Sequence, residues 1–299
     1  MTTEIQDKIL FNTFVAFEKV LKTRVKNAMA CDKEIIPIDE RKKLNKYTRT
    51  FTSNGYRIDY QFPESKDFGR VKEVPYTGLG TFSAPVRGYL ANGIYLDVDM
   101  VNCHPTILRH ELKSKGIDTS IIDEYVDNRE NFLASNGINK TDFLIMINKE
   151  DFKHPNEKIM KLHSQIYNTF IPSLLADNQE ILNSIKKSRT YNKMGTFIAN
   201  YLQSIEFKIL VQLHNFSLKE DIHVDVLMHD GFFVRITETV NESSMADILP
   251  KYSEMIKSKF GLDIKLKLKP HDLSLKIPDI DNMTPLEIHT ETLLEFTKN

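Results

Sequence analysis

The stretch Ile94-Tyr-Leu-Asp-Val-Asp-Met-Val-Asn-Cys-His-Pro105 decides the interpretation of this chain. Apolar residues alternate there with Asp97 and Asp99, as in a β-strand whose successive side chains point to opposite faces. Both carboxylates then leave one face of the sheet. Because two buried carboxylates are costly unless a cation lies between them, the pair predicts a platform for divalent metal ions. The alternative is that one aspartate hydrogen-bonds a turn while the other is solvated.

The composition is that of an ordinary globular protein. The 299 residues are 41% hydrophobic and 27% charged, with a net charge of -1. This length allows one large domain or two smaller ones. No apolar run reaches the roughly 20 residues that span a bilayer, and the N-terminus has no signal-peptide pattern. Since two cysteines cannot build a disulfide framework, we expect a cytoplasmic protein without a membrane partner.

The order of expected elements indicates an interrupted sheet. We expect a helix over the first ~30 residues, short strands at 47–76, the strand 94–101, a helix from Pro105 to Gly116, a helical block at 120–216 broken near Gly137, Pro155, Pro172 and Gly195, a hairpin at 223–236, a helix at 243–260 and a half-exposed strand at 262–268. A catalytic sheet with an inserted helical subdomain has this order. Independent helical and sheet domains are the alternative.

A second acidic element lies in the expected hairpin, Val226-Leu-Met-His-Asp-Gly-Phe-Phe-Val234. Asp230 in its turn is placed at the rim of the sheet, where it can meet Asp99 and share cations. Carboxylate oxygens suit Mg²⁺, and a pair of such ions catalyses phosphoryl transfer. His229 is placed to orient Asp230 or to contact a nucleic-acid terminus. Asp-Gly is also a common turn signal without any catalytic role.

A third element is the helix Lys140-Thr-Asp-Phe-Leu-Ile-Met-Ile-Asn148. Lys140, Phe143 or Leu144, and Asn148 fall near one face. That face offers a cation for a triphosphate, an apolar surface for a base and an amide near the sugar. An ordinary amphipathic helix is the alternative.

Several polar residues are candidates for nucleic-acid contacts. Asn200 and Gln203 recur with Glu206 every third residue of a helix and line either a template groove or its solvated side. Arg70 and Arg87 precede the acidic strand, where they can clamp phosphates. Lys187 and Arg189 belong to a basic run with Lys186 and Lys193, although such runs are often only solvated faces. No P-loop and no Gly-x-Ser-x-Gly motif occurs, which counts against a P-loop helicase and a serine hydrolase.

In this order, the elements resemble the transposon-virus polymerases, a branch related to family A DNA polymerases and single-subunit phage-type RNA polymerases. Leu96-Asp-Val-Asp-Met-Val-Asn-Cys-His-Pro105 is similar to the first catalytic motif, in which an aspartate is followed by a polar residue. Asp99 is our choice for that aspartate, Asp97 is the alternative, and Asn102 is the polar candidate. His104 stands where family A DNA polymerases carry a glutamate that screens the sugar 2′-hydroxyl, so ribose exclusion does not follow.

The other two motifs also resemble those of this family. Lys140 to Asn148 is similar to the fingers helix whose lysine contacts the nucleotide phosphates, although Asn148 replaces a Tyr-Gly pair. His229-Asp230 is similar to the His-Asp of the third motif, with Gly231 in place of an acidic residue or serine.

The resemblance covers about residues 65–275 and implies an α+β polymerase palm, an antiparallel sheet with helices, with a large inserted helical fingers subdomain and a helical N-terminal region. The implied units are a thumb-like N-terminal region at 1–85, palm segments at 86–118 and 223–275, fingers at 119–222 and a tail at 276–299. The implied activity is that of a DNA polymerase and primase in the replication of a virus or mobile element. It would use two Mg²⁺ or Mn²⁺ ions on Asp97, Asp99 and Asp230.

The implied partners are a DNA primer–template, or RNA, nucleoside triphosphates and a replicative helicase. Three other functions stay open. They are a two-metal nuclease on the same carboxylates, an archaeo-eukaryotic-type primase, whose Ser-x-His element is missing, and a non-catalytic nucleic-acid-binding replication factor.

Overall fold

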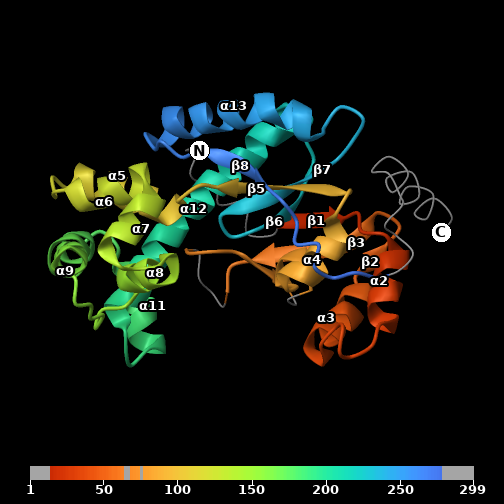
Figure 1. The fold of residues 1–299 in the computed structure, drawn as a ribbon, viewed down its shortest axis with the longest axis horizontal. Helices are drawn as coiled ribbons and strands as arrows, with labels where there is room; N and C mark the ends of the chain where they lie inside the picture. Colours follow the sequence, from red (N-terminus) through yellow and green to blue (C-terminus); the bar gives the residue numbers. More distant parts are fainter. Residues whose placement is uncertain (1–13, 64–67, 75–76, 278–299) are drawn as a thin grey trace.

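The computed structural model describes residues 14–63, 68–74 and 77–277, and within them the strands form two antiparallel sheets flanked by helices (Figure 1). The fold is therefore mixed α/β with antiparallel sheets, as expected. The first sheet contains β1 (Phe14–Glu18), β2 (Phe51–Thr52), β3 (Gly55–Gln61) and β4 (Lys72–Val74). The second sheet contains β5 (Tyr95–Met100), β6 (Val224–Leu227), β7 (Gly231–Arg235) and β8 (Leu266–Lys269).

The second sheet has the order β6-β7-β5-β8, so β5 has a neighbour on each side. Its apolar side chains Leu96, Val98 and Met100 are at most 7% exposed. Asp97 and Asp99 lie on the opposite face and are half-buried. The alternation that predicted this strand is thus explained by a face packed on the core and a polar face.

The predicted hairpin is confirmed. Strands β6 and β7 are joined by Met228, His229 and Asp230, and the amide of Met228 donates to the carbonyl of Gly231 at 2.9 Å. Strand β7 continues the sheet by pairing with β5. The turn therefore lies at the end of the central strand pair.

The helix predicted for the first ~30 residues is confirmed only over Lys22–Ala30 and is wrong at Phe14–Glu18. Phe14–Glu18 is strand β1 and pairs with β3, from Phe14 opposite Tyr60 to Glu18 opposite Tyr56. Only α2 (Lys22–Ala30) is helical, and it is followed by α3 (Ile38–Thr48). Pairing with a strand some forty residues away overrides the local helical periodicity. The first 13 residues lie outside the described residues.

The strands expected between 47 and 76 are present as β2, β3 and β4.

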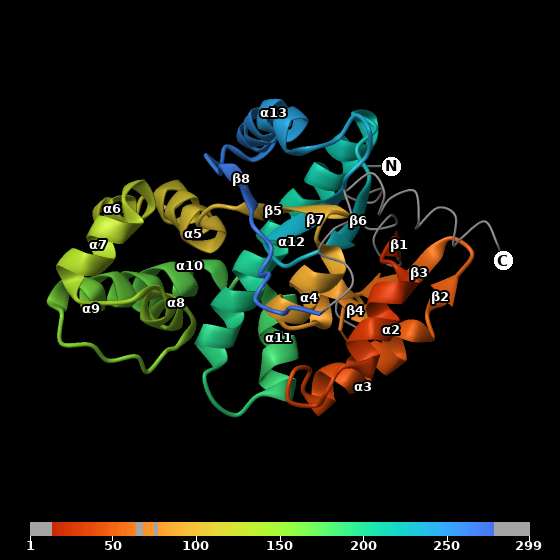
Figure 2. The ribbon, with the colours of Figure 1, turned by 45° about the vertical axis from the view of Figure 1, so that its right-hand side comes forward.

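A helical block separates β5 from β6, as predicted. Figures 1 and 2 show it on one side of the sheets, with α2 and α3 on the other. Ahead of β5 lie the short helices η1 (Leu79–Thr81) and α4 (Ala84–Ala91). The block consists of α5 (Cys103–Ser114), α6 (Ser120–Asp127), α7 (Arg129–Asn136), α8 (Lys140–Asn148), α9 (Glu157–Ser164), the π-helical turn η2 (Gln165–Phe170), α10 (Ile171–Leu174), α11 (Gln179–Ser188) and α12 (Lys193–Lys219).

Breaks between helices occur near three of the four predicted positions, and Pro172 is the exception. Gly137 ends α7, and Pro155 lies in the loop before α9. Pro172 lies inside the helical run from α9 through η2 to α10, because a π-helical turn just before it accommodates the proline without a break. Gly195 lies in the first turn of α12, so the break comes just before it.

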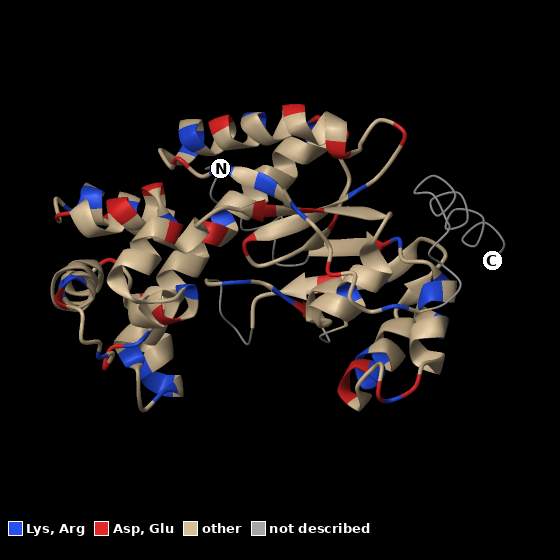
Figure 3. Ribbon diagram, viewed as in Figure 1, with Lys and Arg blue, Asp and Glu red and all other residues tan. Residues whose placement is uncertain are grey.

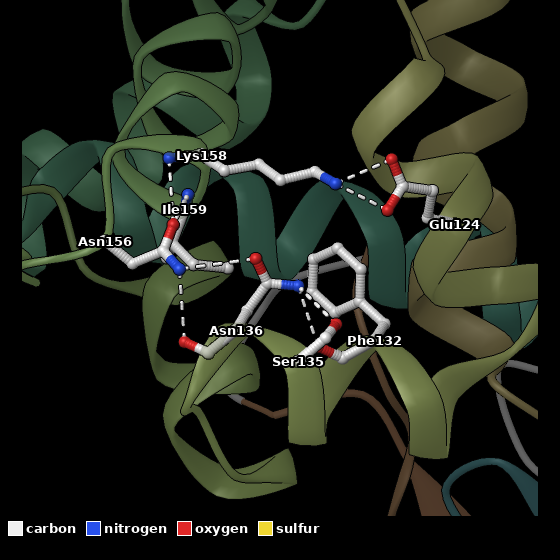
Figure 4. A network of polar contacts seen from close by, with 7 residues as sticks. All are labelled: Glu124, Phe132, Ser135, Asn136, Asn156, Lys158 and Ile159. Atoms are coloured by element: carbon white, nitrogen blue, oxygen red, sulfur yellow. Dashed lines mark hydrogen bonds and ion pairs between the residues drawn. The ribbon is translucent and has the colours of Figure 1, made fainter.

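Asn156 holds the loop before α9 to α7 (Figure 4). Its side-chain oxygen caps α9 by accepting from the amides of Lys158 and Ile159, at 2.9 and 3.2 Å. Its Nδ2 donates to the carbonyl of Asn136 at 3.2 Å. Lys158 then forms an ion pair with Glu124 of α6. These contacts fix the return of the chain from the loop after α8 to α6 and α7.

The last elements agree with the prediction. Helix α13 (Glu242–Phe260) begins with a capping box of Asn241 and Ser244 and ends at Gly261. Strand β8 starts at Leu266 rather than at Leu262, but Leu262, Ile264 and Leu266 are buried in alternation. The predicted tail beyond residue 277 lies outside the described residues. None of the helices in the described ranges is both long enough and apolar enough to cross a bilayer.

The first prediction concerns the contact between α8 and α12. A Cβ atom on Gly195 would lie 2.2 Å from the carbonyl oxygen of Asn148. Helix propensity alone makes Gly195→Ala stabilising by about 1 kcal/mol, whereas the clash with backbone costs about 1–3 kcal/mol. We expect the free energy of unfolding, measured by urea titration, to fall. Ser188→Ala at the exposed end of α11 is the control, expected within about 0.5 kcal/mol of the unmodified protein. A rise for Gly195→Ala would contradict the close approach.

Candidate active site

Asp97 and Asp99 lie on the central strand β5 between two partners. Asp99 is opposite Gly231 of β7 and Lys267 of β8, and Asp97 is opposite Phe233 and Lys269. Partial burial raises the pKa of Asp97 to about 6, against the opposing effect of Lys269. Burial and then the charge of Asp230 raise the pKa of Asp99. The strand therefore holds two carboxylates that favour a compensating cation.

The backbone of Asp230 lies next to the end of β5, close to Asp99. Its carbonyl accepts from the amide of Met100 at 2.8 Å, and the next residue, Gly231, pairs with Asp99. Asp230 is exposed in the hairpin turn. A carboxylate of the central strand and one of the hairpin turn are thus close enough for Asp230 to raise the pKa of Asp99. Two carboxylates fit Mg²⁺, which usually takes one or two protein carboxylates and completes its shell with water and substrate phosphates. No group of three or more His, Cys, Asp or Glu side chains suited to hold a metal occurs in residues 14–63, 68–74 and 77–277.

Glu206 of α12 links three segments next to the hairpin. Arg70 donates to both of its carboxylate oxygens, at 2.5 and 2.7 Å, and Nε2 of His104 lies 2.9 Å from Oε2. Burial favours a raised pKa for the fully buried Glu206, but the bonds from Arg70 and His104 bring its pKa below the usual value. The sequence placed Glu206 in a polar stripe without revealing these partners, which are 136 and 102 residues away.

Asn200 and Gln203 lie in the same region. The amide of Gly69 donates to Ser204 at 2.9 Å, and a Cβ on Gly69 would lie 3.1 Å from the Asn200 side-chain oxygen and 3.7 Å from that of Gln203. Both side chains are half-buried. The segment around Arg70 therefore packs along the polar stripe of α12, which joins two groups that the sequence had predicted separately.

Helix α8 presents Lys140 to the site but not Phe143. Lys140 is exposed and acts on Asp99 by opposing the rise of its pKa. Phe143 is fully buried and stacks on Tyr125 at a ring-centroid distance of 3.7 Å. Its ring is thus in the core of the helical block, away from any nucleotide. Leu144, the alternative in the same prediction, is half-buried and remains the candidate surface for a base.

The two asparagines predicted to bind nucleotide have internal contacts. Nδ2 of Asn148 donates to the carbonyl of Leu144 at 2.8 Å. Asn102 precedes α5 in the left-handed conformation, with φ 51°, and its Oδ1 accepts from Arg129 at 2.9 Å. Asn102 therefore ties the start of α5 to α7, a role that local sequence did not indicate.

Arg87, His229, Lys187 and Arg189 were also predicted to contact nucleic acid, and not all of them lie near the aspartates. Arg87 is near Asp97 and opposes the rise of its pKa, while one guanidinium nitrogen donates to the carbonyl of Phe82 at 3.0 Å. His229 is exposed in the turn. Partial burial of its imidazole and then the charge of Arg70 lower its pKa. Lys187 and Arg189 are exposed at the C-terminal end of α11, and Figure 3 shows blue segments of the ribbon at its lower left, where α11 ends. The structure does not bring these two residues to the aspartates.

A cavity of about 250 Å³ opens beside the hairpin. It is lined by Tyr60, Arg70, Val71, Lys72, Glu73, Gly80, Thr81, Glu206, Phe207, Leu210, Leu227, Met228 and His229. Glu73 was missed by the sequence analysis. It is 5% exposed and accepts from the amides of Gly78 and Gly80, and burial raises its pKa to about 7. An acidic residue ahead of a Gly-Leu-Gly turn was the available signal.

Comparisons with known proteins give two partial likenesses. The chain matches none of the protein-family profiles. It is 25% identical over 235 residues to a protein of Sputnik virophage named "Putative helicase V13"; the match covers 71% of this chain and 30% of that protein. Among solved structures, it is similar to the POL domain of Pol1 from M. smegmatis, in complex with DNA primer-template and dNTP. That match has a TM-score of 0.47 and 9% identity and covers 78% of this chain and 51% of the other. Neither match establishes a family.

The raised pKa of Asp97 predicts a pH-dependent stability. In the folded protein this pKa is about 6, whereas an unfolded aspartate titrates near ~3.9. The folded state therefore binds the proton more tightly, and stability falls as pH rises from about 4 to 6. In metal-free buffer, we expect Asp97→Asn to be more stable than the unmodified protein at pH 7.5 by about 1–2 kcal/mol, and equal to it near pH 4.

The measurement is urea unfolding across this pH range with a chelator present. Asp247→Asn on exposed α13 is the control and should change stability by less than about 0.5 kcal/mol. A destabilised Asp97→Asn at pH 7.5 would show that the carboxylate is held by protein contacts rather than poised for a cation.

Proposed function

We propose that this chain is a template-directed nucleotidyltransferase, a DNA polymerase that also primes synthesis, with Asp99 and Asp230 as its principal metal ligands. The observation that supports it best is the register of β5 with the hairpin, which sets Asp230 beside Asp99 through the Met100–Asp230 backbone bond. Asp97 on the same strand face supports the pair. In this proposal the palm comprises residues 86–118 and 223–275, the fingers 119–222 and a thumb-like region residues 1–85.

The proposed reaction is an in-line displacement. The 3′-oxygen of the growing strand forms a bond to the α-phosphorus, the bond between the α-phosphorus and the bridging oxygen breaks, pyrophosphate leaves with the electron pair, and the hydroxyl proton passes to solvent. When bound, two Mg²⁺ ions, or Mn²⁺, activate the attacking oxygen and neutralise the leaving group. The chain's own contribution is positioning and charge stabilisation.

The other side chains have distinct roles in this proposal. Lys140 binds the triphosphate, with Leu144 against the base. His104 lies in the first turn of α5, and its side chain is held by Glu206 of α12. In this position it lies near the sugar. Arg70 and His229 flank the cavity at the hairpin and contact the strand end, and Arg87 is close to Asp97. Asn200 and Gln203 follow the template, as Lys187 and Arg189 do farther out on α11.

The virophage relative bears on the partners. Its name refers to a helicase, but this chain contains no P-loop motif and spans 30% of that protein. We therefore assign no helicase activity to these residues and propose that a replicative helicase acts with them on viral or mobile-element DNA in the cytoplasm.

Asp230→Asn tests the assignment. We expect Mg²⁺-dependent extension of a labelled primer on a DNA template to fall by about a hundredfold or more, because a group worth several kcal/mol to the transition state is lost. Asp221→Asn is the matched control. It removes the same charge from an exposed aspartate at φ 56°, a conformation that asparagine accepts.

The same assay separates the competing functions. Unprimed single strands with ribonucleotides test priming, and an RNA template tests the choice of template. Shortening of the primer would favour a two-metal nuclease on the same carboxylates. Binding of primer–template without any metal-dependent change would favour a non-catalytic replication factor, and the polymerase proposal would fail.

A further inference from the structure

Two lysines of β8 lie directly beside the acidic pair. Lys267 is opposite Asp99 and Lys269 is opposite Asp97 in the antiparallel register. Directly opposed residues of neighbouring strands place their side chains on the same face of the sheet. Both lysines are exposed, whereas Leu266 is buried and Leu268 half-buried. The lysine side chains therefore belong to the face that carries the two aspartates.

The two sides of β5 differ in charge. On the β7 side, the positions opposite Asp99 and Asp97 are Gly231 and Phe233, which carry no charge. The hairpin and its cavity lie on that side, where Arg70 is neutralised by Glu206. On the β8 side are the two lysines, and both oppose the rise of the pKa of Asp99, as Lys140 does. The two lysines directly opposite the carboxylates therefore lie on the side of β5 away from the hairpin.

Lys267 and Lys269 are not paired with acidic side chains in the described residues. In the part of the chain that the structure describes, neither has a carboxylate oxygen within 4 Å. Lysines on an edge strand can simply prevent edge-to-edge association, and β8 is an edge strand in this sheet. That role requires a charge on β8 but not its placement opposite two catalytic candidates.

We propose that Lys267 and Lys269 form a polyphosphate subsite, which binds the β- and γ-phosphates of the incoming nucleotide and then the pyrophosphate product. This inference rests on the proposed function. In an in-line displacement, the attacking and leaving oxygens lie on opposite sides of the phosphorus. With the strand end at the cavity beside His229, the leaving group points across β5 toward β8. Two lysines and Lys140 supply the positive charge that a departing pyrophosphate requires.

The test uses Lys267→Gln, Lys269→Gln and the double variant of the full chain. Lys257→Gln on exposed α13 is the control, because it removes one surface charge and equally weakens non-specific attraction to nucleic acid. The assay measures KM for the nucleotide, kcat, inhibition by pyrophosphate, affinity for primer–template and the thermal midpoint of unfolding.

For each single variant, we expect KM for the nucleotide and the inhibition constant of pyrophosphate to rise about five- to tenfold. These changes should occur with little change in primer–template affinity or thermal midpoint. Arginine at either position should restore most of the affinity. Weaker primer–template binding with an unchanged KM would overturn the proposal in favour of a backbone contact. Values equal to those of the Lys257→Gln control would show that the lysines only protect the edge.

A separate readout keeps this inference distinct from the proposed function. Binding of Mg²⁺–pyrophosphate alone, followed by calorimetry, requires no turnover. If the unmodified chain incorporates no nucleotide but binds pyrophosphate through the two lysines, the polymerase proposal fails and the subsite stands. If it extends primers and the lysine variants bind pyrophosphate unchanged, the subsite fails alone.

Discussion

Repulsion among carboxylates on a central strand is the constraint on which this structure depends. Strand β5 must bury Leu96 and Val98 on one face while it carries Asp97 and Asp99 on the other. Asp230 adds a third negative charge at the end of the same strand pair and raises the pKa of both. A strand selected only for stability would not hold these charges together, since opposed cations are needed to offset them. The surrounding elements supply such cations as Lys140, Lys267 and Lys269.

The rigidity of this arrangement comes from the junction between the two sheets. The Tyr60 hydroxyl accepts from the amide of Leu227 at 3.1 Å, which joins β3 to β6. The Tyr95 hydroxyl donates to Asp225 at 3.0 Å and accepts from the amide of Lys19. Asp225 is also paired with Arg235 by two bonds of 2.7 Å. The first sheet and Lys19, the residue that follows β1, are thus bonded to two strands of the second sheet, β6 and β5, and these two bonds cross the unit boundary expected at residue 85.

Local patterns predicted the elements whose neighbours are close in sequence or whose periodicity is strict. The alternation at 94–101, the Asp-Gly turn and the capped helix before Gly261 are such cases. Strand β1 was missed because its hydrogen-bond partners come from β3, which no local pattern reveals. Phe143 was offered together with Leu144 because two adjacent apolar residues at a helical face do not show which of them is inward. The partners of Glu206 and the register of β8 with β5 depend on contacts more than 100 residues apart, so sequence periodicity showed the lysine row but not the aspartates beside it.

Charged side chains are arranged differently on the two sides of β5, the hairpin side and the β8 side. On the hairpin side, the Arg70 charge is cancelled by Glu206, and burial brings the pKa of Glu73 to about 7. Lys72 lines the same cavity, so basic and acidic side chains are mixed on that side. On the β8 side, Lys267 and Lys269 face solvent next to the carboxylates. Under the proposed function, the polyphosphate is expected on the side of the two lysines, opposite an in-line attack from the hairpin side.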